Sequence, residues 1–359
     1  MPELPEVERA AALIREIGTG KRIDRVETVQ DDIVFSGISH NEFAHEITGR
    51  TIQDARRYGK VFYVQLDGEG RLPVLHFGMT GMLQVKGQLA TYYKETPRSA
   101  STQWPPRFMK FILHLHDPVS GETTHLAFLD ARRLGRIRLC ASPLEEPPIC
   151  DLGYDPIISM PPLAEFQAKL LKRTCPIKAL LLDQSFTAGV GNWVADEILY
   201  HARVHPEQRC NTLLEEHIAA IHHHTAEVCK LAVAVNADDT KFPEDWLMKH
   251  RWGKGKKKAH TLNLPSGGLA TIKWVTVGGR TSAFVEELQP LRKPGISVKD
   301  AEEGSESDLP DLTDSDMEDP QSVQQAKRKR QPPRRTSRHF KNQETSKPNP
   351  GSKKRARQS

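Results

Sequence analysis

An amine nucleophile and two carboxylates stand together at the start of the chain, in the sequence Met1-Pro2-Glu3-Leu4-Pro5-Glu6. If Met1 is removed, as is usual before a small residue, Pro2 presents a free secondary amine. The pKa of an α-amino group is about 7.7 to 8.0, so a sizeable fraction of this amine is unprotonated and nucleophilic near neutral pH. A secondary amine that attacks a sugar C1′ becomes an iminium ion, which acidifies the neighbouring carbon and permits elimination of a phosphate. Glu3 could then transfer protons.

The same residues also suit the start of an ordinary helix. Pro5 fits a first helical turn, and Glu6 and Glu8 complement the positive end of the helix. The apolar residues that follow have helical spacing and predict one buried face: Val7, Ala11, Leu13 and Ile14. These residues alone leave the structural and the catalytic interpretation equally open.

Composition limits the possible classes of protein. The 359 residues are enough for two domains. Residues 292–359 contain 16 basic and 11 acidic residues, so this tail carries the whole formal net charge of +5. A nucleic-acid site in the rest of the chain must therefore depend on individually placed residues rather than on bulk charge.

Five cysteines without a CxxC pair predict a reducing compartment and no cysteine zinc site. His222-His223-His224 does not suggest a metal either, because adjacent side chains on a helix point to different faces. No apolar run reaches the roughly 18 residues of a membrane helix, and the N-terminus does not resemble a secretory signal. We therefore expect a soluble intracellular protein that needs no cofactor.

Periodicity divides the chain into a β-rich and a helical part, which predicts an α+β fold. Residues 20–140 contain short β-branched and aromatic runs separated by turn residues, the pattern of a β-sandwich or barrel. The helical part ends in a predicted hairpin on Gly278-Gly279. The expected divisions are an N-terminal catalytic domain, a linker, a helical domain with its hairpin at about 268–288, and a tail: 1–150, 151–162, 163–291 and 292–359.

The tail is predicted to be disordered. Residues 300–319 hold ten acids and no base, and residues 320–359 hold thirteen bases and one acid, so neither block can bury enough apolar surface to fold. The basic clusters at 327–330, 334–335 and 353–357 could be nuclear-import signals, DNA-binding patches or both. We expect a nuclear protein whose tail contacts import factors and repair proteins.

A second motif follows one predicted helix and opens another. Gly189 and Gly191 allow close backbone approach, and the helix beginning at Asn192 offers unpaired N–H groups. Together these features suit a DNA phosphate. Asn192 is also a good helix N-cap in any protein.

With both motifs in order, the chain resembles the formamidopyrimidine-DNA glycosylase family, the Fpg and Nei-like enzymes of base excision repair. The resemblance spans about residues 2–291 and is nearest to the plant and fungal branch, whose finger keeps its hairpin without zinc. It implies an N-terminal β-sandwich with an initial helix, and a C-terminal helix–two-turn–helix domain that ends in a zincless β-hairpin finger.

The resemblance also implies catalytic roles for four residues. Pro2 would attack C1′ of the damaged nucleotide, and Glu3 would be the acid and base that helps to open the sugar ring. Glu6 would support the site through hydrogen bonds. Lys60 matches the family's lysine near the lesion and its phosphate, although on sequence alone it is an ordinary strand lysine.

Six further residues are implied to bind DNA. His76, Asn192 and Arg280 would contact the backbone, while Met79 and Arg132 would fill the gap left by an extruded nucleotide. Leu134 stands where the family has a Phe wedge, which leaves the preference for lesion and opposite base open. No metal is predicted, since the hairpin lacks cysteines. The expected partner of this monomer is double-stranded DNA with oxidised bases or abasic sites.

The implied function is a bifunctional DNA glycosylase and AP lyase that acts through a Pro2 Schiff base with β,δ-elimination. Its implied substrates are formamidopyrimidines and further-oxidised guanine, with 8-oxoguanine less favoured. Residues 252–264 do not resemble the loop that bacterial Fpg enzymes place over 8-oxoguanine. The alternative is a catalytically silent protein that binds damaged DNA or chromatin, which would follow if Met1 stayed on. An RNA-binding protein is supported only by the basic tail.

Overall fold

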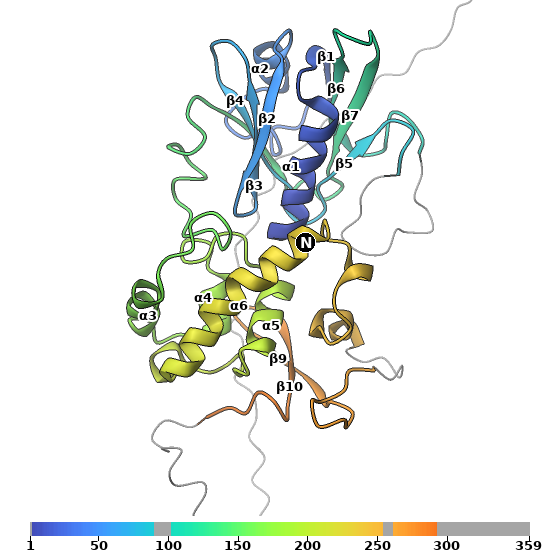
Figure 1. Ribbon diagram of the computed structural model, residues 1–359. Helices are drawn as coiled ribbons and strands as arrows, with labels where there is room; N and C mark the ends of the chain where they lie inside the picture. Colours follow the sequence, from blue (N-terminus) through green and yellow to red (C-terminus); the bar gives the residue numbers. More distant parts are fainter. Residues whose placement is uncertain (1, 90–101, 254–260, 293–359) are drawn as a thin grey trace, which may run out of the picture. The chain divides into compact units, whose positions relative to one another are not determined.

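The first helix packs against both halves of the fold, a β-sandwich and a helical half. The computed structural model describes residues 2–89, 102–253 and 261–292. Helix α1 (Leu4–Gly18) begins where the backbone N–H of Glu3 donates to Oε2 of Glu6 over 2.9 Å. Val7, Ala11 and Ile14 are buried, as the spacing predicts, whereas Leu13 is only partly buried. Figure 1 shows α1 beside strands β2 (Ile52–Tyr58) and β3 (Val61–Leu66). Leu4, at its first turn, packs instead into the core of the helical half.

Two antiparallel four-stranded sheets follow, with helix α2 (His40–Ile47) between β1 (Arg22–Thr28) and β2 (Ile52–Tyr58) along the chain. The alternation of apolar and polar residues gives each sheet one inner face, and leucines, phenylalanines and isoleucines form most of the shared core. The structure is therefore the sandwich rather than the barrel. The strand order in one sheet is β1 (Arg22–Thr28), β6 (Met109–His116), β7 (Thr123–Leu129) and β5 (Met82–Val85). The strand order in the other sheet is β2 (Ile52–Tyr58), β3 (Val61–Leu66), β4 (Leu72–His76) and β8 (Arg136–Cys140).

The helical half surrounds the fully buried Trp193. Its aromatic ring packs against Phe242 and Trp246, which lie after the last long helix. The elements are α3 (Leu163–Leu171), α4 (Ile177–Leu182), α5 (Asn192–His201), α6 (Glu215–Ala234) and 3-10 turns at Cys210–Thr212, Asp239–Lys241, Leu247–Lys249 and Arg251–Gly253.

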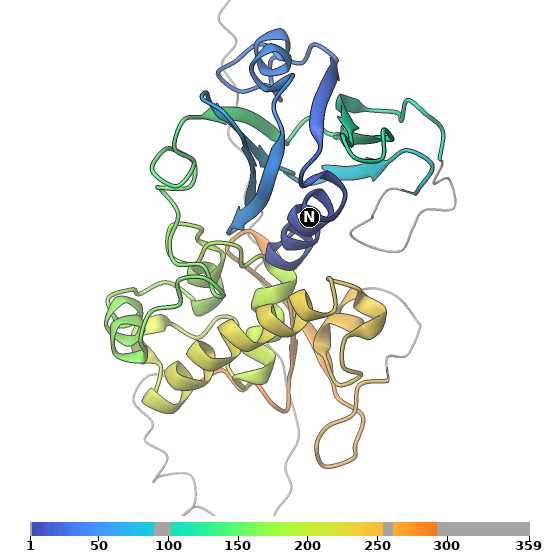
Figure 2. The same cartoon turned by 45° about the horizontal axis from the view of Figure 1, so that its top comes forward.

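The predicted hairpin is present as β9 (Ile272–Val277) and β10 (Arg280–Val285). Gly278 and Gly279 have φ of 57° and 70°, so the two-residue turn requires the left-handed conformation that glycine tolerates. Strand β10 packs along α5 (Figure 2). Arg280 pairs with Val277 across the turn, so it lies at the turn end of the hairpin.

The predicted disorder of the tail concerns residues that, apart from 292, lie outside the described part of the chain. Within the described ranges, no helix combines the length and apolar character needed to cross a membrane. The proposed division at residues 150, 162 and 291 stays a prediction.

Candidate active site

Glu3 is held at the start of α5, far along the chain from its own helix. Its carboxylate oxygens accept hydrogen bonds from the backbone N–H groups of Trp193 (3.0 Å) and Val194 (3.1 Å). The first N–H groups of a helix lack intrahelical partners and lie at its positive end, so they satisfy and stabilise a buried carboxylate. Only 1% of Glu3 is exposed. The fold therefore fixes this carboxylate one residue from the predicted nucleophile.

Gly189 and Gly191, which precede α5, leave room for the side chains of Leu4 and Glu3. A Cβ on Gly191 would lie 2.3 Å from Cδ of Glu3, and one on Gly189 would lie 2.8 Å from the Leu4 side chain. The prediction that this helix start offers its N–H groups to a DNA phosphate is wrong for Trp193 and Val194, because Glu3 occupies both. Asn192 is also not the N-cap, since Gly191 takes that position.

Glu6 lies beside Glu3 in the same buried site. Its Oε1 accepts from Nε1 of Trp193 (3.2 Å), and its Oε2 accepts from the Glu3 backbone N–H. Burial and, secondly, the charge of Glu3 raise the pKa of Glu6 from 4.5 to about 7. Glu6 can therefore exchange a proton near neutral pH.

The raised pKa of Glu6 predicts a pH-dependent loss of stability. The folded protein holds this proton up to about pH 7, whereas the unfolded chain releases it near 4.5, so the contribution is complete below 4.5 and is lost as pH rises through 7. Relative to Glu6→Gln, the wild type should lose roughly 2 to 3 kcal/mol of unfolding free energy between pH 5 and pH 8. Urea unfolding at pH 5 and 8 measures the difference. If the unfolding free energies of the wild type and Glu6→Gln change equally with pH, the prediction is wrong.

Lys60 sits in the turn between β2 and β3 and points its amine into the protein. Its Nζ donates to the Val190 carbonyl at 2.9 Å, and burial lowers the pKa of this amine. The turn is fixed by the buried Asp155, which accepts from the Gly59 N–H (2.8 Å) and pairs with Arg57. Asp155 follows the β-sandwich, so the predicted linker itself positions Lys60.

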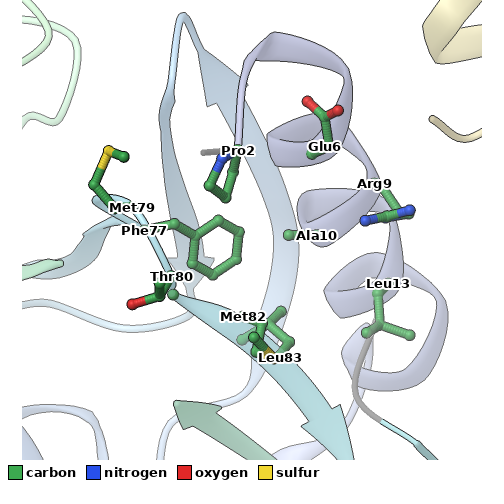
Figure 3. Close-up of a pocket in the computed structure, with 11 residues that line it drawn as sticks. Pro2, Glu6, Arg9, Ala10, Leu13, Phe77, Met79, Thr80, Met82 and Leu83 are labelled. Carbon is green, nitrogen blue, oxygen red and sulfur yellow. The ribbon is translucent and has the colours of Figure 1, made fainter. Parts of the chain in front are cut away.

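Pro2 lines a pocket formed by α1 and the segment between β4 and β5. Figure 3 shows Pro2 with Met79 on one side and Glu6 on the other. Arg9 adds a second polar group, and most of the other lining residues are apolar: Ala10, Leu13, Phe77, Met82 and Leu83, together with Thr80 and Gly81. The predicted nucleophile therefore adjoins a cavity with a largely apolar wall and a titratable carboxyl group.

His76 ends strand β4 as a neutral imidazole. Burial first, and the charge of Lys60 second, lower its pKa to about 4. Its Nδ1 accepts from the Gly78 N–H at 3.1 Å, so Nε2 carries the proton. Any phosphate contact of His76 would use a neutral N–H donor rather than a cation.

Asp130 organises the loop that carries Arg132 and Leu134. It is fully buried, and its Oδ1 accepts from Oγ1 of Thr80 (2.9 Å) and the Arg132 N–H (3.2 Å), while Oδ2 accepts from the Gly135 N–H (2.7 Å). One carboxylate thereby joins the Met79 segment to the Arg132 loop.

The two loops also touch through their backbones. Gly78 has φ of 60°, and a Cβ there would lie 2.4 Å from the Leu134 carbonyl oxygen. Leu134 is 40% exposed. Arg133 is paired with Asp31 (3.0 Å), whereas Arg132 is exposed. Arg132 and Leu134 therefore project from a loop that Arg133 anchors.

Asn192 contacts the hairpin at the residue that follows Arg280. Nδ2 of Asn192 donates to the Thr281 carbonyl at 2.9 Å, next to Arg280. The charge of Arg280 also contributes to lowering the pKa of Lys60, so these two cations lie within electrostatic range. The backbone-contact residues predicted from distant parts of the sequence thus converge.

One cluster departs from the expectation for adjacent histidines. On α6, Nδ1 of His224 lies 2.7 Å and Nε2 of His223 lies 3.5 Å from Oε2 of Glu227. Rotation about the side chains brings the two rings together even though their Cβ atoms diverge. The cluster contains none of the residues that line the Pro2 pocket.

Family models of known proteins match both halves of the chain. The N-terminal domain model of formamidopyrimidine-DNA glycosylases matches residues 1–137, and their H2TH domain model matches residues 152–244. A formamidopyrimidine-DNA glycosylase of Arabidopsis thaliana is 40% identical over 298 residues, which cover 81% of this chain and 71% of that protein. The chain belongs to the formamidopyrimidine-DNA glycosylase family. A bacterial member from Listeria innocua is 32% identical over 67% of this chain and 81% of its own length.

Solved structures of the family share the fold. Lactococcus lactis formamidopyrimidine-DNA glycosylase, bound non-covalently to DNA with an AP site, matches with a TM-score of 0.63 at 25% identity. The match covers 80% of this chain and 99% of that one. As a formamidopyrimidine-DNA glycosylase family member, the chain is a DNA glycosylase and AP lyase of base excision repair.

Sequence reasoning missed the buried acids that support this family's site. Asp130 lies two residues before Arg132, but the sequence-based prediction assigned roles only to Arg132 and Leu134. Asp155 pairs with Arg57, and Asp196 pairs with Arg251 as well as with Lys178, so their partners are distant from them in the sequence. An acid next to a motif residue was the available signal for Asp130, and the other two had none.

Proposed function

We propose that the chain excises formamidopyrimidines and further-oxidised guanine from double-stranded DNA, with Pro2 as its nucleophile. The observation that carries the proposal is the position of Pro2 at a pocket beside Glu6 and Met79, with the buried carboxylate of Glu3 next to it. The Lactococcus enzyme, in a variant form, has been crystallised with DNA containing Fapy-dG, which supports the same substrate class here.

In the proposed reaction, the Pro2 nitrogen attacks C1′ while the bond from C1′ to the base breaks and the base leaves with a proton. Glu3 protonates O4′, which opens the sugar and leaves an iminium between Pro2 and C1′. Loss of a C2′ proton then expels the 3′ phosphate. A second elimination removes a C4′ proton and expels the 5′ phosphate. Water then hydrolyses the iminium, which frees Pro2 and releases the unsaturated sugar fragment, so a one-nucleotide gap remains.

The duplex must be opened before this chemistry can begin. An enzyme that acts on a base extrudes the nucleotide from the stack and fills the vacated space. Lys60, Asn192 and Arg280 would grip the backbone around the extruded nucleotide, with His76 as a neutral donor. Because Lys60 and Arg280 are cationic, we expect binding to weaken with salt despite the balanced charge outside the tail.

We propose that the two joined loops fill the space that the extruded nucleotide leaves. Met79 projects from one loop, and Arg132 and Leu134 project from the other. An apolar side chain can wedge between base steps and hold a kink. Since Asp130 ties the loops together, we infer that the three side chains enter the duplex as one unit.

Substrate preference is tested with duplexes that carry a single defined lesion opposite cytosine. We expect faster single-turnover release of formamidopyrimidine-guanine than of 8-oxoguanine, with phosphate left at both edges of the gap. Residues 254–260, within the segment that differs from the bacterial loop, lie outside the described residues. Equal or faster release of 8-oxoguanine would overturn the proposed preference, and products with a 3′ unsaturated aldehyde alone would overturn δ-elimination.

We also propose that the basic clusters of the tail direct the chain to the nucleus. Lys327-Arg328-Lys329-Arg330 and the cluster at 353–357 have the composition of import signals. Microscopy of the fluorescently tagged chain, compared with a form in which both clusters are neutralised, tests the proposal. Nuclear accumulation that survives neutralisation would contradict it.

A further inference from the structure

Strand β10 exposes one hydrogen-bonding edge to helix α5, because β9 pairs only with its other edge. Thr281 and Ala283, two residues apart, direct their backbone groups to the same side of the strand. The Thr281 carbonyl accepts from Nδ2 of Asn192 (2.9 Å), and the Ala283 N–H donates to Oδ2 of Asp196 (3.1 Å).

The spacing of these contacts matches a helix to a strand. Residues four apart on a helix lie on one face at about 6 Å, and residues two apart on a strand are separated by nearly 7 Å. Asn192 and Asp196 can therefore satisfy Thr281 and Ala283 together. Two side chains of α5 take the place of a third strand along this hairpin.

The Asp196 carboxylate also forms ion pairs with two buried cations. Lys178 from α4 pairs with its Oδ1, and Nζ of Lys178 donates to the Asn192 carbonyl at 2.8 Å. Arg251 approaches Oδ2 with both Nε (3.1 Å) and Nη2. All three side chains are at most 5% exposed. The Arg251 carbonyl in turn accepts from Nε1 of Trp274 on β9 (3.1 Å), so the network reaches both strands.

We propose that Asp196 is a positioning residue for DNA binding, which fixes the hairpin on α5 and thereby sets the place of Arg280. The inference rests on the proposed function of Arg280 as a backbone contact. A hairpin of two strands is marginal by itself, and this one has no cysteines to bind a metal. The ion network of Asp196, Lys178 and Arg251 supplies the fixed attachment that a metal site would otherwise give.

The test replaces Asp196 with Asn in the full chain and measures binding to a duplex with a tetrahydrofuran abasic analogue. A displacement of about 1 Å at a positioning contact can cost about 100-fold, so we expect binding weaker by about 10- to 100-fold. Hydrogen exchange at the Ala283 amide should accelerate. Glu286→Gln is the matched control, because it breaks an exposed ion pair with Lys273 on the same hairpin and should leave binding unchanged.

Removing one member of a buried ion network can unfold a protein, so Arg251→Lys provides a second variant. It keeps the positive charge but loses the two-point contact with Oδ2, and it should weaken binding in the same direction. Each substitution is repeated with Arg280→Ala. If Asp196 acts through Arg280, the additional loss in that background should be within about twofold, whereas independent effects would multiply.

The inference is overturned if Arg251→Lys, or a folded Asp196→Asn, binds like the wild type with a protected Ala283 amide. It is also overturned if the losses multiply with that of Arg280→Ala, since Asp196 would then act on general stability. Borohydride trapping of the wild type on abasic DNA separates the two proposals. A wild type that forms no adduct contradicts the proposed chemistry, whereas normal trapping with either result above contradicts only the role of Asp196.

Discussion

Replacing Glu3 with Gln is expected to slow strand cleavage at an abasic site by about 10²- to 10⁴-fold, the usual contribution of a positioned acid and base. The carboxylate lies next to Pro2 and accepts from Trp193 and Val194 through its two oxygens. A Gln keeps the shape but has one acceptor and cannot cycle a proton. Single-turnover cleavage of a duplex with one abasic site measures the loss.

Glu16→Gln is the matched control for that variant, because Glu16 is an exposed acid on the same helix. It should cleave at the wild-type rate. Circular dichroism must show that the Glu3 variant is folded, since a group buried at a helix start also contributes to stability. A folded Glu3→Gln protein within threefold of the wild type would show that Glu3 has no catalytic role.

Adding a single methyl group at Gly191 should almost abolish activity. An alanine Cβ would stand 2.3 Å from Cδ of Glu3 and 2.6 Å from its Oε1, so the carboxylate or the start of α5 must move. Overpacking of this kind costs about 1 to 3 kcal/mol of stability, and a displacement near 1 Å can cost about 100-fold in rate. We expect cleavage by Gly191→Ala to fall at least about 100-fold.

Gly268→Ala provides the comparison, since the nearest atom to its added Cβ would be 4.0 Å away. Its activity and unfolding free energy should match those of the wild type. Comparison of unfolding with cleavage then separates overpacking from catalysis. Wild-type cleavage by Gly191→Ala would mean that Glu3 is not held at α5 during the reaction.

Local patterns in the sequence predicted much of the fold. Alternating runs predicted the strands, a two-glycine turn predicted the hairpin, and apolar spacing predicted α1. Each of these signals depends on residues close together in the chain. The closure of the strands into a sandwich, rather than a barrel, depends on which strands pair at long range, and sequence periodicity leaves that choice open.

The candidate site was predictable where a motif was short and unusual. Pro2 and Glu3 stood out because an N-terminal amine and an adjacent acid suggest a specific reaction. Gly191 was assigned to the wrong partner, since the sequence shows that a glycine permits close approach but not what approaches. Its neighbour in the structure is Glu3, which lies near the N-terminus and far from Gly191 in the sequence. The roles of Asp130, Asp155 and Asp196 likewise depend on tertiary contacts that a single sequence does not display.

The central claim is that the Pro2 amine forms an iminium with the sugar of a damaged nucleotide. Incubation with abasic-site DNA and sodium borohydride, followed by peptide mapping, tests it directly. The account predicts a covalent adduct on Pro2 in protein verified to lack Met1, and no adduct in protein that retains Met1. An adduct on a lysine, or no adduct from the protein with a free Pro2, would contradict the account.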